Sequence, residues 1–456
     1  MWRDMTTPPR RPSVRRYFAP VRLTSLVRLF SGALLLGSGL ALGKFHATFR
    51  GGYDLTETSR VWWILAFTGV VVLAGYALGF PEQPSARTPL LTALIAAVVP
   101  PALFAIVQIG IGELVIPRFF LLLSVPLNAM LFWAGWWVSR RLTKSAIAQE
   151  RVVFIGSVDD ATVVGSDINF HTEVACSIVA VLDPLGEYDW DQLEQSCVEH
   201  HASMVVYSSS VIADQDVVAA LARVHASGVR VRDLSGFYDT FIGKVPIREL
   251  EATALLFDVR EVHHPAYSRI SRMFDVIFAS VGVAALGIAI PFVAIGNIIG
   301  NRGPLFYSQD RVGKGSSTFR ILKFRSMSPG GGTSQWTAEN DPRITRFGKI
   351  LRLTHIDELP QVLNILKGEL SLVGPRPEQP QYVATLSETI PFYGSRHLVR
   401  PGLTGWAQVN YPYGADEIDA FEKLQYEFWY LKHQRLVLDL VIIARTVRHV
   451  LGFGGR

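Results

Sequence analysis

Two adjacent carboxylates, Asp357 and Glu358, stand at the start of a segment in which leucines recur at helical spacing. Pro360 favours a helix start, because proline lacks the N–H donor and is tolerated only in the first turn, and Gly368 favours the helix end. We therefore expect Asp357 at or next to the N-cap and Glu358 in the first turn. Free backbone N–H groups there would hold a carboxylate ionised and attract phosphate, which suits an aspartate that attacks a phosphoryl group. For the pair in isolation, helix capping for stability alone is the alternative.

Two cations precede this pair on an expected strand, Phe319–Met327. Side chains on a strand repeat every second residue, so Lys323 and Arg325 are expected on one face, about 6–7 Å apart. Two cations at that distance can span a diphosphate. The alternative is a solvated strand edge that carries protective charges.

A third cation, Arg376, lies between two prolines in Gly374-Pro-Arg-Pro377, and Glu378 follows directly. A residue before proline is pushed out of the helical region, so Arg376 is expected on a stiff, extended loop. A rigid guanidinium can make bidentate contacts to phosphate oxygens at a low entropic cost. A structural turn is the alternative for this segment by itself.

Four long apolar stretches begin the chain and indicate membrane attachment. With 456 residues and 49% hydrophobic content, the chain is too long for one compact domain and too apolar for an ordinary soluble protein. A helix needs about 20 apolar residues to cross a bilayer. We expect four transmembrane helices, together forming a bundle over residues 21–142: Leu26–Gly43, Val61–Phe80, Leu90–Ile109 and Phe119–Val138.

The placement of cations predicts the orientation of this bundle. A basic tail, residues 1–20, precedes the first stretch and leads into it without a cleavage site, and Arg140, Arg141 and Lys144 follow the fourth stretch. Both ends are therefore expected in the cytoplasm, although Lys44, Arg50 and Arg60 lie in the first outer loop. The formal net charge of +5 does not by itself choose between nucleic acid, anionic lipid and phosphorylated substrates.

Residues 143–262 predict a small Rossmann-like α/β domain. Buried strands are expected at Arg151–Gly156, Cys176–Leu182 and Met204–Tyr207, with a helix within Asp214–Gly228. The turn after the first strand keeps only the first glycine of the dinucleotide-binding pattern, so we expect no bound NAD. The two cysteines, Cys176 and Cys197, form no metal-binding pattern and are expected to be buried thiols.

A fifth apolar stretch, Met273–Ile299, is interrupted by Pro291. A full span would place every later residue outside the cell, whereas proline bends a helix. We expect a re-entrant helix, about residues 270–299, that enters the cytoplasmic leaflet and returns. It belongs to a mainly α monotopic domain over residues 263–456.

Five motifs in this order resemble the bacterial sugar transferases, the monotopic polyprenyl-phosphate phosphoglycosyltransferases in their large form. They are Lys323-Phe-Arg-Ser-Met327, Asn340-Asp-Pro-Arg-Ile-Thr345, Asp357-Glu-Leu-Pro-Gln361, Gly374-Pro-Arg-Pro377 and Arg400-Pro-Gly-Leu-Thr-Gly-Trp-Ala-Gln408. The resemblance covers about residues 269–450. The chain departs from it at the helix break, where Ile290 precedes Pro291 although family members often have serine there.

The resemblance implies an enzyme that transfers hexose-1-phosphate from a UDP-sugar to undecaprenyl phosphate in the bacterial inner membrane, as a first step of exopolysaccharide or O-antigen synthesis. It implies that Asp357 is the nucleophile, that Glu358 assists by proton handling or metal coordination, and that Mg²⁺ neutralises the diphosphate. The candidate substrate ligands are Lys323, Arg325, Arg352, Arg376, Glu378, Trp406 and Gln408.

Some alternatives stay open. Arg400–Tyr413 suits either a uridine or sugar site or a packed loop, and the run 436–451 suits either a membrane-surface helix or a core helix. A membrane-tethered nucleotide-sugar oxidoreductase and a non-enzymatic polysaccharide export or regulatory protein are the competing functions. No nucleic-acid partner is expected, a homo-oligomer is compatible with the sequence, and glucose is favoured over galactose or an N-acetylhexosamine because 409–414 resembles exopolysaccharide members.

Overall fold

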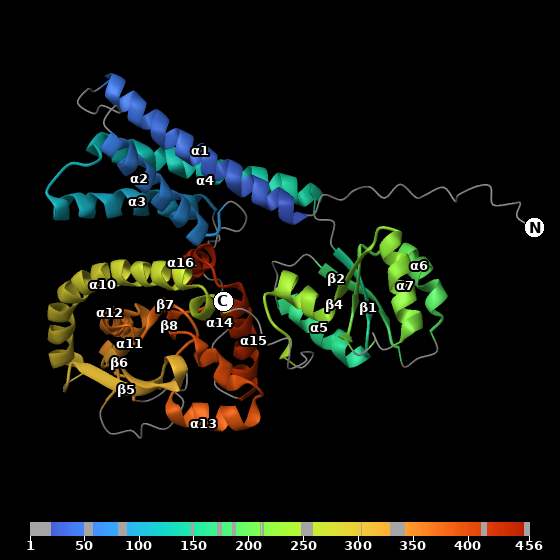
Figure 1. Cartoon of the computed structure of the whole chain (residues 1–456). Coiled ribbons are helices and arrows are strands. Elements are labelled where there is room, and N and C mark those ends of the chain that lie inside the picture. The colour runs from blue at the N-terminus through green and yellow to red at the C-terminus, as the bar shows by residue number, and fades with distance from the viewer. Residues whose placement is uncertain are drawn as a thin grey trace, which may run out of the picture. The chain divides into compact units, whose positions relative to one another are not determined.

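A computed structural model describes most of the chain (Figure 1). The described residues are 20–49, 58–80, 89–146, 150–170, 176–184, 188–209, 211, 214–247, 259–301, 303–328, 343–411 and 417–450. The predicted basic tail before residue 20 and the motif residues 340–342 lie outside these ranges.

Four helices form where the four apolar stretches predict them: α1 Pro20–Phe49, α2 Thr58–Ala77, α3 Pro89–Ile111 and α4 Arg118–Ala146. Among the described residues, α1 and α4 contain segments long and apolar enough to cross a membrane, Leu29–Phe49 and Arg118–Arg141. The apolar segments of α2 and α3 are shorter, Arg60–Tyr76 and Thr92–Ala105. The helices themselves are confirmed, and a bilayer crossing by all four stays a prediction.

The side chain of Phe67 links α2 to both α3 and α4. Its ring meets the rings of Phe104 and Phe120 edge-on, with centroids 5.3 and 5.4 Å apart. Such edge-to-face pairs add to the free energy of apolar burial.

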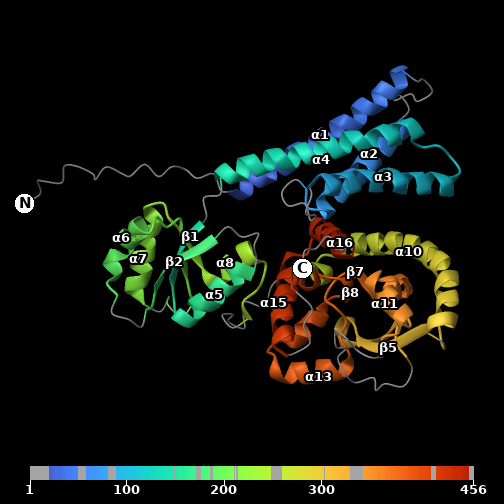
Figure 2. The same cartoon turned by 180° about the vertical axis from the view of Figure 1, so that it is seen from behind.

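The α/β region has a four-stranded, fully parallel sheet in the order β2-β1-β3-β4. Even-numbered β1 residues such as Phe154 pack towards α5 and α8, and odd-numbered ones such as Val153 pack towards α6 and α7, so that both faces are covered (Figure 2). The elements are β1 Glu150–Ile155, α5 Val158–Phe170, β2 Cys176–Leu182, η1 Trp190–Gln192, α6 Leu193–Glu199, β3 Met204–Tyr207, α7 Gln215–Ala226, β4 Arg230–Asp233, α8 Leu234–Phe237 and η3 Tyr238–Ile242.

Both cysteines are free and buried, as predicted. Burial raises the pKa of the Cys176 thiol to about 12 and that of Cys197 to about 11. Thiols of such high pKa are poor nucleophiles at neutral pH.

We call residues 244–456 the C-terminal unit; its described residues are mainly helical, as predicted. Its two small sheets are an antiparallel hairpin of β5 and β6 and a parallel pair of β7 and β8. Its elements are α9 Arg260–His263, α10 Pro265–Gly300, β5 Phe306–Val312, η6 Lys314–Ser316, β6 Thr318–Phe324, α11 Arg346–Leu353, η7 Ile356–Gln361, α12 Val362–Lys367, β7 Ser371–Val373, α13 Pro380–Thr389, η8 Tyr393–Leu398, β8 Gly402–Thr404, α14 Trp406–Asn410, α15 Glu417–His433 and α16 Leu436–Val450.

Residues 244–247 pack against helix α15 of this unit. Lys244 is 2.6 Å from the Glu422 carboxylate, and the Val245 N–H donates to the Gln425 carbonyl of α15. Val245 and Ile247 also belong to the same apolar cluster as Phe428, which makes α15 a core helix.

The fifth apolar stretch forms one long helix, α10, and Pro291 lies inside it. The ribbon of α10 curves strongly towards β5 in its C-terminal half (Figure 1). Large apolar side chains such as Phe292 and Ile299 are exposed on it, 71% and 77% respectively. By length and composition α10 is the third described helix able to cross a membrane.

Glycines on the packed side of α10 allow α11 to approach closely. A Cβ added at Gly296 would overlap the ring of Phe347, and one at Gly300 would come within 2.9 Å of the Phe347 Cβ. Gly287, on the same helix, has no described atom within 4 Å of such a Cβ.

We predict that Gly296→Ala destabilises the protein by about 1–3 kcal/mol, the usual cost of overpacking a tight contact. Gly287→Ala is the matched control and is expected to be neutral or slightly stabilising, because alanine favours the helix. Thermal unfolding of the detergent-purified variants measures both. Equal melting temperatures for the two variants would contradict this packing of α10 on α11.

Candidate active site

The hairpin β5–β6 presents Lys323 to the carboxylate pair. Lys323 lies opposite Tyr307 near the end of the hairpin. Its ammonium group donates to Glu358 Oε1 at 2.6 Å. Lys323 and the Asp357–Glu358 pair are therefore neighbours in the structure.

Arg325 does not join Lys323 at the carboxylate pair, because its guanidinium contacts a different part of the chain. Strand β6 ends at Phe324, and the Arg325 side chain turns to the C-terminal end of α10. Its Nη2 donates to the Asn301 carbonyl at 2.5 Å, and the side chain is buried. The Arg325 N–H still donates to the Leu305 carbonyl across the hairpin at 3.0 Å, so the two cations differ in the partners that the tertiary structure gives them and not in strand pairing.

The carboxylate pair lies near the start of a 3₁₀ turn, η7, and not in the first turn of an α-helix as predicted. His355 precedes the turn in the left-handed region, with φ 55°, and Asp357 is the second residue of the turn. The α-helix itself, α12, starts only at Val362, after Pro360. Gly368 ends α12 in the left-handed conformation, with φ 87°, as predicted.

Arg352, on α11, acts on Asp357 through its charge. Thr345 caps this helix by accepting from the Gly348 N–H at 2.9 Å, and Arg352 Nε donates to Ser326 Oγ at 3.0 Å. The positive charge of Arg352 is one of those that lower the pKa of Asp357.

Asp357 is buried, and its pKa is raised above its usual value. Burial is the largest cause and the negative charge of Glu358 adds to it, while Lys323, Arg352 and His355 act in the opposite direction. The sequence predicted a carboxylate held ionised by a helix start. The pKa of Asp357 is raised instead, because the loss of hydration on burial outweighs the effect of the cations around it.

The pKa of Glu358, in contrast, is lowered. Burial disfavours its ionised form, but Lys323 and Arg376 outweigh burial and lower the pKa to about 2. Arg376 Nη2 lies 3.7 Å from Glu358 Oε1. Glu358 therefore stays ionised at any ordinary pH, which favours a charge-organising role over proton handling.

Glu378 lies away from this pair. Its carboxylate is 3.7 Å from Arg311 Nη1, and its carbonyl accepts from the Val312 N–H of β5. Its visible role is to attach the end of the Gly374–Glu378 loop to the hairpin.

A small pocket adjoins Arg376 and is also lined by Trp406, Gln408, Glu427 and Tyr430. The ring of Trp406 stacks on Trp429 with centroids 4.6 Å apart. Because Trp406 is only 8% exposed, its described contacts are those of a packed core residue. Gln408 Oε1 is a buried acceptor with no partner among the described residues, so it is the more available of the two for a ligand.

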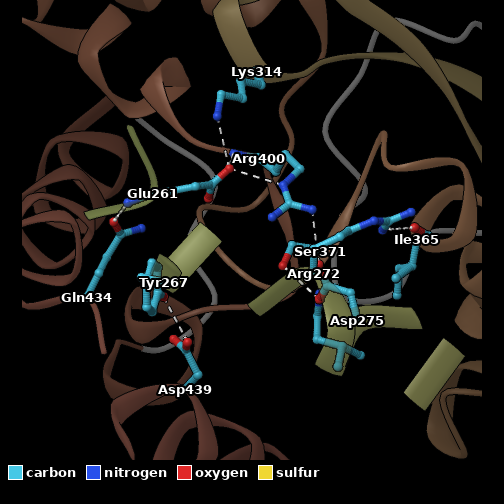
Figure 3. A network of polar contacts seen from close by, with 11 residues as sticks. Glu261, Tyr267, Arg272, Asp275, Lys314, Ile365, Ser371, Arg400, Gln434 and Asp439 are labelled. Carbon is cyan, nitrogen blue, oxygen red and sulfur yellow. Dashed lines mark hydrogen bonds and ion pairs between the residues drawn. The ribbon is translucent and has the colours of Figure 1, made fainter. Parts of the chain in front are cut away.

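Polar contacts, shown in Figure 3, attach the N-terminal half of α10 to α12, β7 and Arg400. Arg272 donates to the Leu366 carbonyl at the end of α12 at 2.7 Å. Asp275 accepts from Ser371 Oγ at 3.0 Å and from the Leu372 N–H at 2.9 Å, and it lies 3.2 Å from Arg400. The sequence offered one signal for this network, a carboxylate within an apolar stretch.

We predict that Arg352→Gln moves the acid limb of the pH–activity profile to higher pH. A nucleophilic carboxylate must be ionised, and removal of a nearby cation raises the pKa of Asp357 further. The profile of kcat/KM between pH 4 and 8 measures this shift. Arg320→Gln, which changes a 79% exposed arginine on the hairpin, is the control. An unchanged acid limb in Arg352→Gln would show that Arg352 does not act on the titrating group.

Comparison with known proteins gives a consistent assignment. Residues 266–453 match the family described as Bacterial sugar transferase. The chain is 36% identical over 288 residues to a UDP-N-acetylgalactosamine-undecaprenyl-phosphate N-acetylgalactosaminephosphotransferase of Aeromonas hydrophila. The matched region is 60% of this chain and 67% of that protein.

Two further relatives have glucose in their names. A UDP-glucose:undecaprenyl-phosphate glucose-1-phosphate transferase of Xanthomonas campestris pv. campestris is 42% identical over 183 residues, 39% of this chain and 38% of that protein. An undecaprenyl-phosphate glucose phosphotransferase of Komagataeibacter xylinus is 30% identical over 339 residues, 68% of this chain and 60% of that protein. The chain thus matches between 38% and 67% of the length of these three relatives. From the matched motifs and these relatives, the chain belongs to the bacterial sugar transferase family.

Proposed function

We propose that the protein transfers hexose-1-phosphate from a UDP-hexose to undecaprenyl phosphate, which yields undecaprenyl-diphosphate-hexose and UMP. The observation that carries the proposal is the site itself: a buried aspartate beside an ionised glutamate, with Lys323 and Arg376 on that glutamate. The relatives named above support the same reaction class.

In the first half-reaction, a carboxylate oxygen of Asp357 bonds to the phosphorus that bears the sugar. The bond from this phosphorus to the oxygen bridging the two phosphates breaks, and UMP leaves with the electron pair. Lys323, Arg352 and Arg376 are the candidate cations that stabilise the charge on the phosphates.

In the second half-reaction, an oxygen of undecaprenyl phosphate attacks the phosphorus of the aspartyl phosphosugar. The bond from phosphorus to Asp357 breaks, and the carboxylate is regenerated with the new diphosphate linkage on the lipid. The two displacements at the same phosphorus need one nucleophile from the protein, Asp357, and no oxidant or reductant.

Asp357 and Glu358 also fit a Mg²⁺ site. Mg²⁺ in phosphoryl-transfer enzymes is bound by one or two carboxylates together with substrate phosphates. The described residues hold no cluster of three or more acidic, histidine or cysteine side chains, so a site completed by the substrate is the one they fit. When bound, the ion would neutralise diphosphate charge.

The membrane arrangement belongs to the same proposal. We place the protein in the bacterial inner membrane with the C-terminal unit on the cytoplasmic face, where nucleotide sugars are. The strong curvature of α10 and the proline inside it support a re-entrant helix. Such a helix keeps the substrate site on one side of the bilayer and close to the lipid phosphate.

We predict that Asp357→Asn abolishes lipid-dependent UMP release. The measurement uses detergent-purified protein, Mg²⁺, undecaprenyl phosphate and a panel of UDP-sugars that includes glucose, galactose and their N-acetylated forms. Asp310→Asn, a change at a 63% exposed carboxylate on the hairpin, is the matched control and is expected to be active.

The panel also names the sugar, which the family does not fix because the relatives differ in it. Wild-type turnover in Asp357→Asn would remove Asp357 as the nucleophile. Failure of folded wild-type protein to release UMP from any UDP-sugar would overturn the transfer reaction.

We predict that EDTA suppresses UMP release and that Mg²⁺ restores it. Glu358→Gln is expected to raise the Mg²⁺ concentration for half-maximal activity by about tenfold or more, because a charged ligand or its organising neighbour is lost. A Mg²⁺ titration of both proteins measures this change. Activity that is insensitive to EDTA would exclude the proposed role of the ion.

A further inference from the structure

The Gly374–Glu378 loop carries Arg376, and its backbone is held from outside the loop at nearly every position. The Gly374 N–H donates to the Thr404 carbonyl of β8. The next four carbonyls, of residues 375–378, each accept a hydrogen bond at 2.8–3.0 Å. In order, the donors are Gly402 N–H, Arg396 Nη2, Arg311 Nη1 and Val312 N–H.

The loop backbone depends on hydrogen bonds from other elements. Two of its five residues are prolines, which have no N–H donor, and the segment belongs to no helix or strand. The orientation of Arg376 therefore depends on donors supplied by other elements. Arg396 is the donor to the carbonyl of Arg376 itself, at 2.9 Å.

Arg396 is almost completely buried, with a side chain only 4% exposed. The same Nη2 lies 2.7 Å from Glu427 Oε1, and Nη1 donates to the Tyr393 hydroxyl at 2.6 Å. Glu427 is also buried, and it lines the small pocket next to Arg376. Three elements, η8, α15 and the loop, thus meet at one guanidinium.

Stability alone explains this arrangement poorly. A buried ion pair is often no more stabilising than apolar residues of similar size, because both charges lose their hydration. Here Arg396 Nε also has no hydrogen-bond partner among the described residues, which adds a further cost. A planar guanidinium, in contrast to an ammonium group, can hold a carbonyl, a carboxylate and a hydroxyl in fixed directions at once.

We propose that Arg396, with Glu427 as its counter-ion, is a positioning residue for Arg376. By fixing the carbonyl of Arg376, it sets the direction in which that side chain leaves the loop. The Arg376 side chain is 39% exposed, so a diphosphate can reach it, and it starts from a defined position 3.7 Å from Glu358. The inference rests on the proposed function, because the ligand of Arg376 is the UDP-sugar diphosphate.

A double-mutant cycle tests this role. Arg396→Lys keeps a positive charge beside Glu427 but loses the planar set of donors. It is expected to lower kcat/KM for the UDP-sugar on the order of tenfold, because small misplacements of a binding group are costly. In an Arg376→Lys background the side chain is a flexible ammonium group without a planar set of donors, so its binding depends less on the direction that the loop gives it. The Arg396→Lys change is then expected to cost less than about threefold.

Arg272→Lys is the matched control in the same cycle. Arg272 also donates to backbone carbonyls, but these belong to α12. Its loss is expected to reduce kcat/KM by the same factor in both backgrounds. An equal factor for Arg396→Lys in both backgrounds would overturn the positioning role and leave a purely structural one.

Two additional measurements keep the test decisive. Thermal unfolding identifies a variant that does not fold, in which case Glu427→Gln, which retains an acceptor for Arg396, replaces Arg396→Lys in the cycle. Calorimetric binding of UDP gives a second readout that needs no turnover, and its affinity is expected to show the same coupling. If UDP binding by the four proteins of the cycle shows this coupling but the wild type releases no UMP, the transfer reaction is refuted and the positioning role is not. If the proteins are active but show no coupling, only the positioning role is refuted.

Discussion

An apolar helix that also carries a buried carboxylate and a half-buried arginine constrains the C-terminal unit. The N-terminal half of α10 contains Arg272 and Asp275, and a charge in such a helix is tolerated only when it is paired and hydrogen-bonded. Their partners are the end of α12, the start of β7 and Arg400. These contacts fix the position of α10 relative to the segments that follow the turn carrying Asp357.

The carboxylates of that turn are adjacent in sequence but have opposite environments. Asp357 is short of water and is flanked by the negative charge of Glu358, so its pKa rises. Glu358 has direct cation partners, so its pKa falls to about 2. Separation of two pKa values by environment is the usual way in which a pair of acids acquires two roles. In the proposed reaction, Glu358 holds the cations in place and leaves Asp357 as the nucleophile.

Helix α15 connects several parts of this unit. Its residues Glu422 and Gln425 bind the segment that begins at Lys244, and Glu427 binds Arg396. The loop with Arg376 therefore depends on a helix 40 or more residues later in the chain, which no local pattern in Gly374-Pro-Arg-Pro377 indicates. Rigid presentation of a binding group by supporting residues of this kind is what a phosphate site requires.

The sequence by itself determined the elements and the chemistry on offer: four apolar helices, the strands around Val153 and Val205, the end of α12 at Gly368, and the motifs that define the family. These follow from local periodicity and backbone preferences, which act within a few residues. Only the tertiary structure decided that Arg325 turns to α10, that Trp406 packs on Trp429, that burial raises the pKa of Asp357, and that Arg396 holds the Arg376 loop. Each of these depends on desolvation and on partners distant in sequence, and neither quantity is a property of a local pattern.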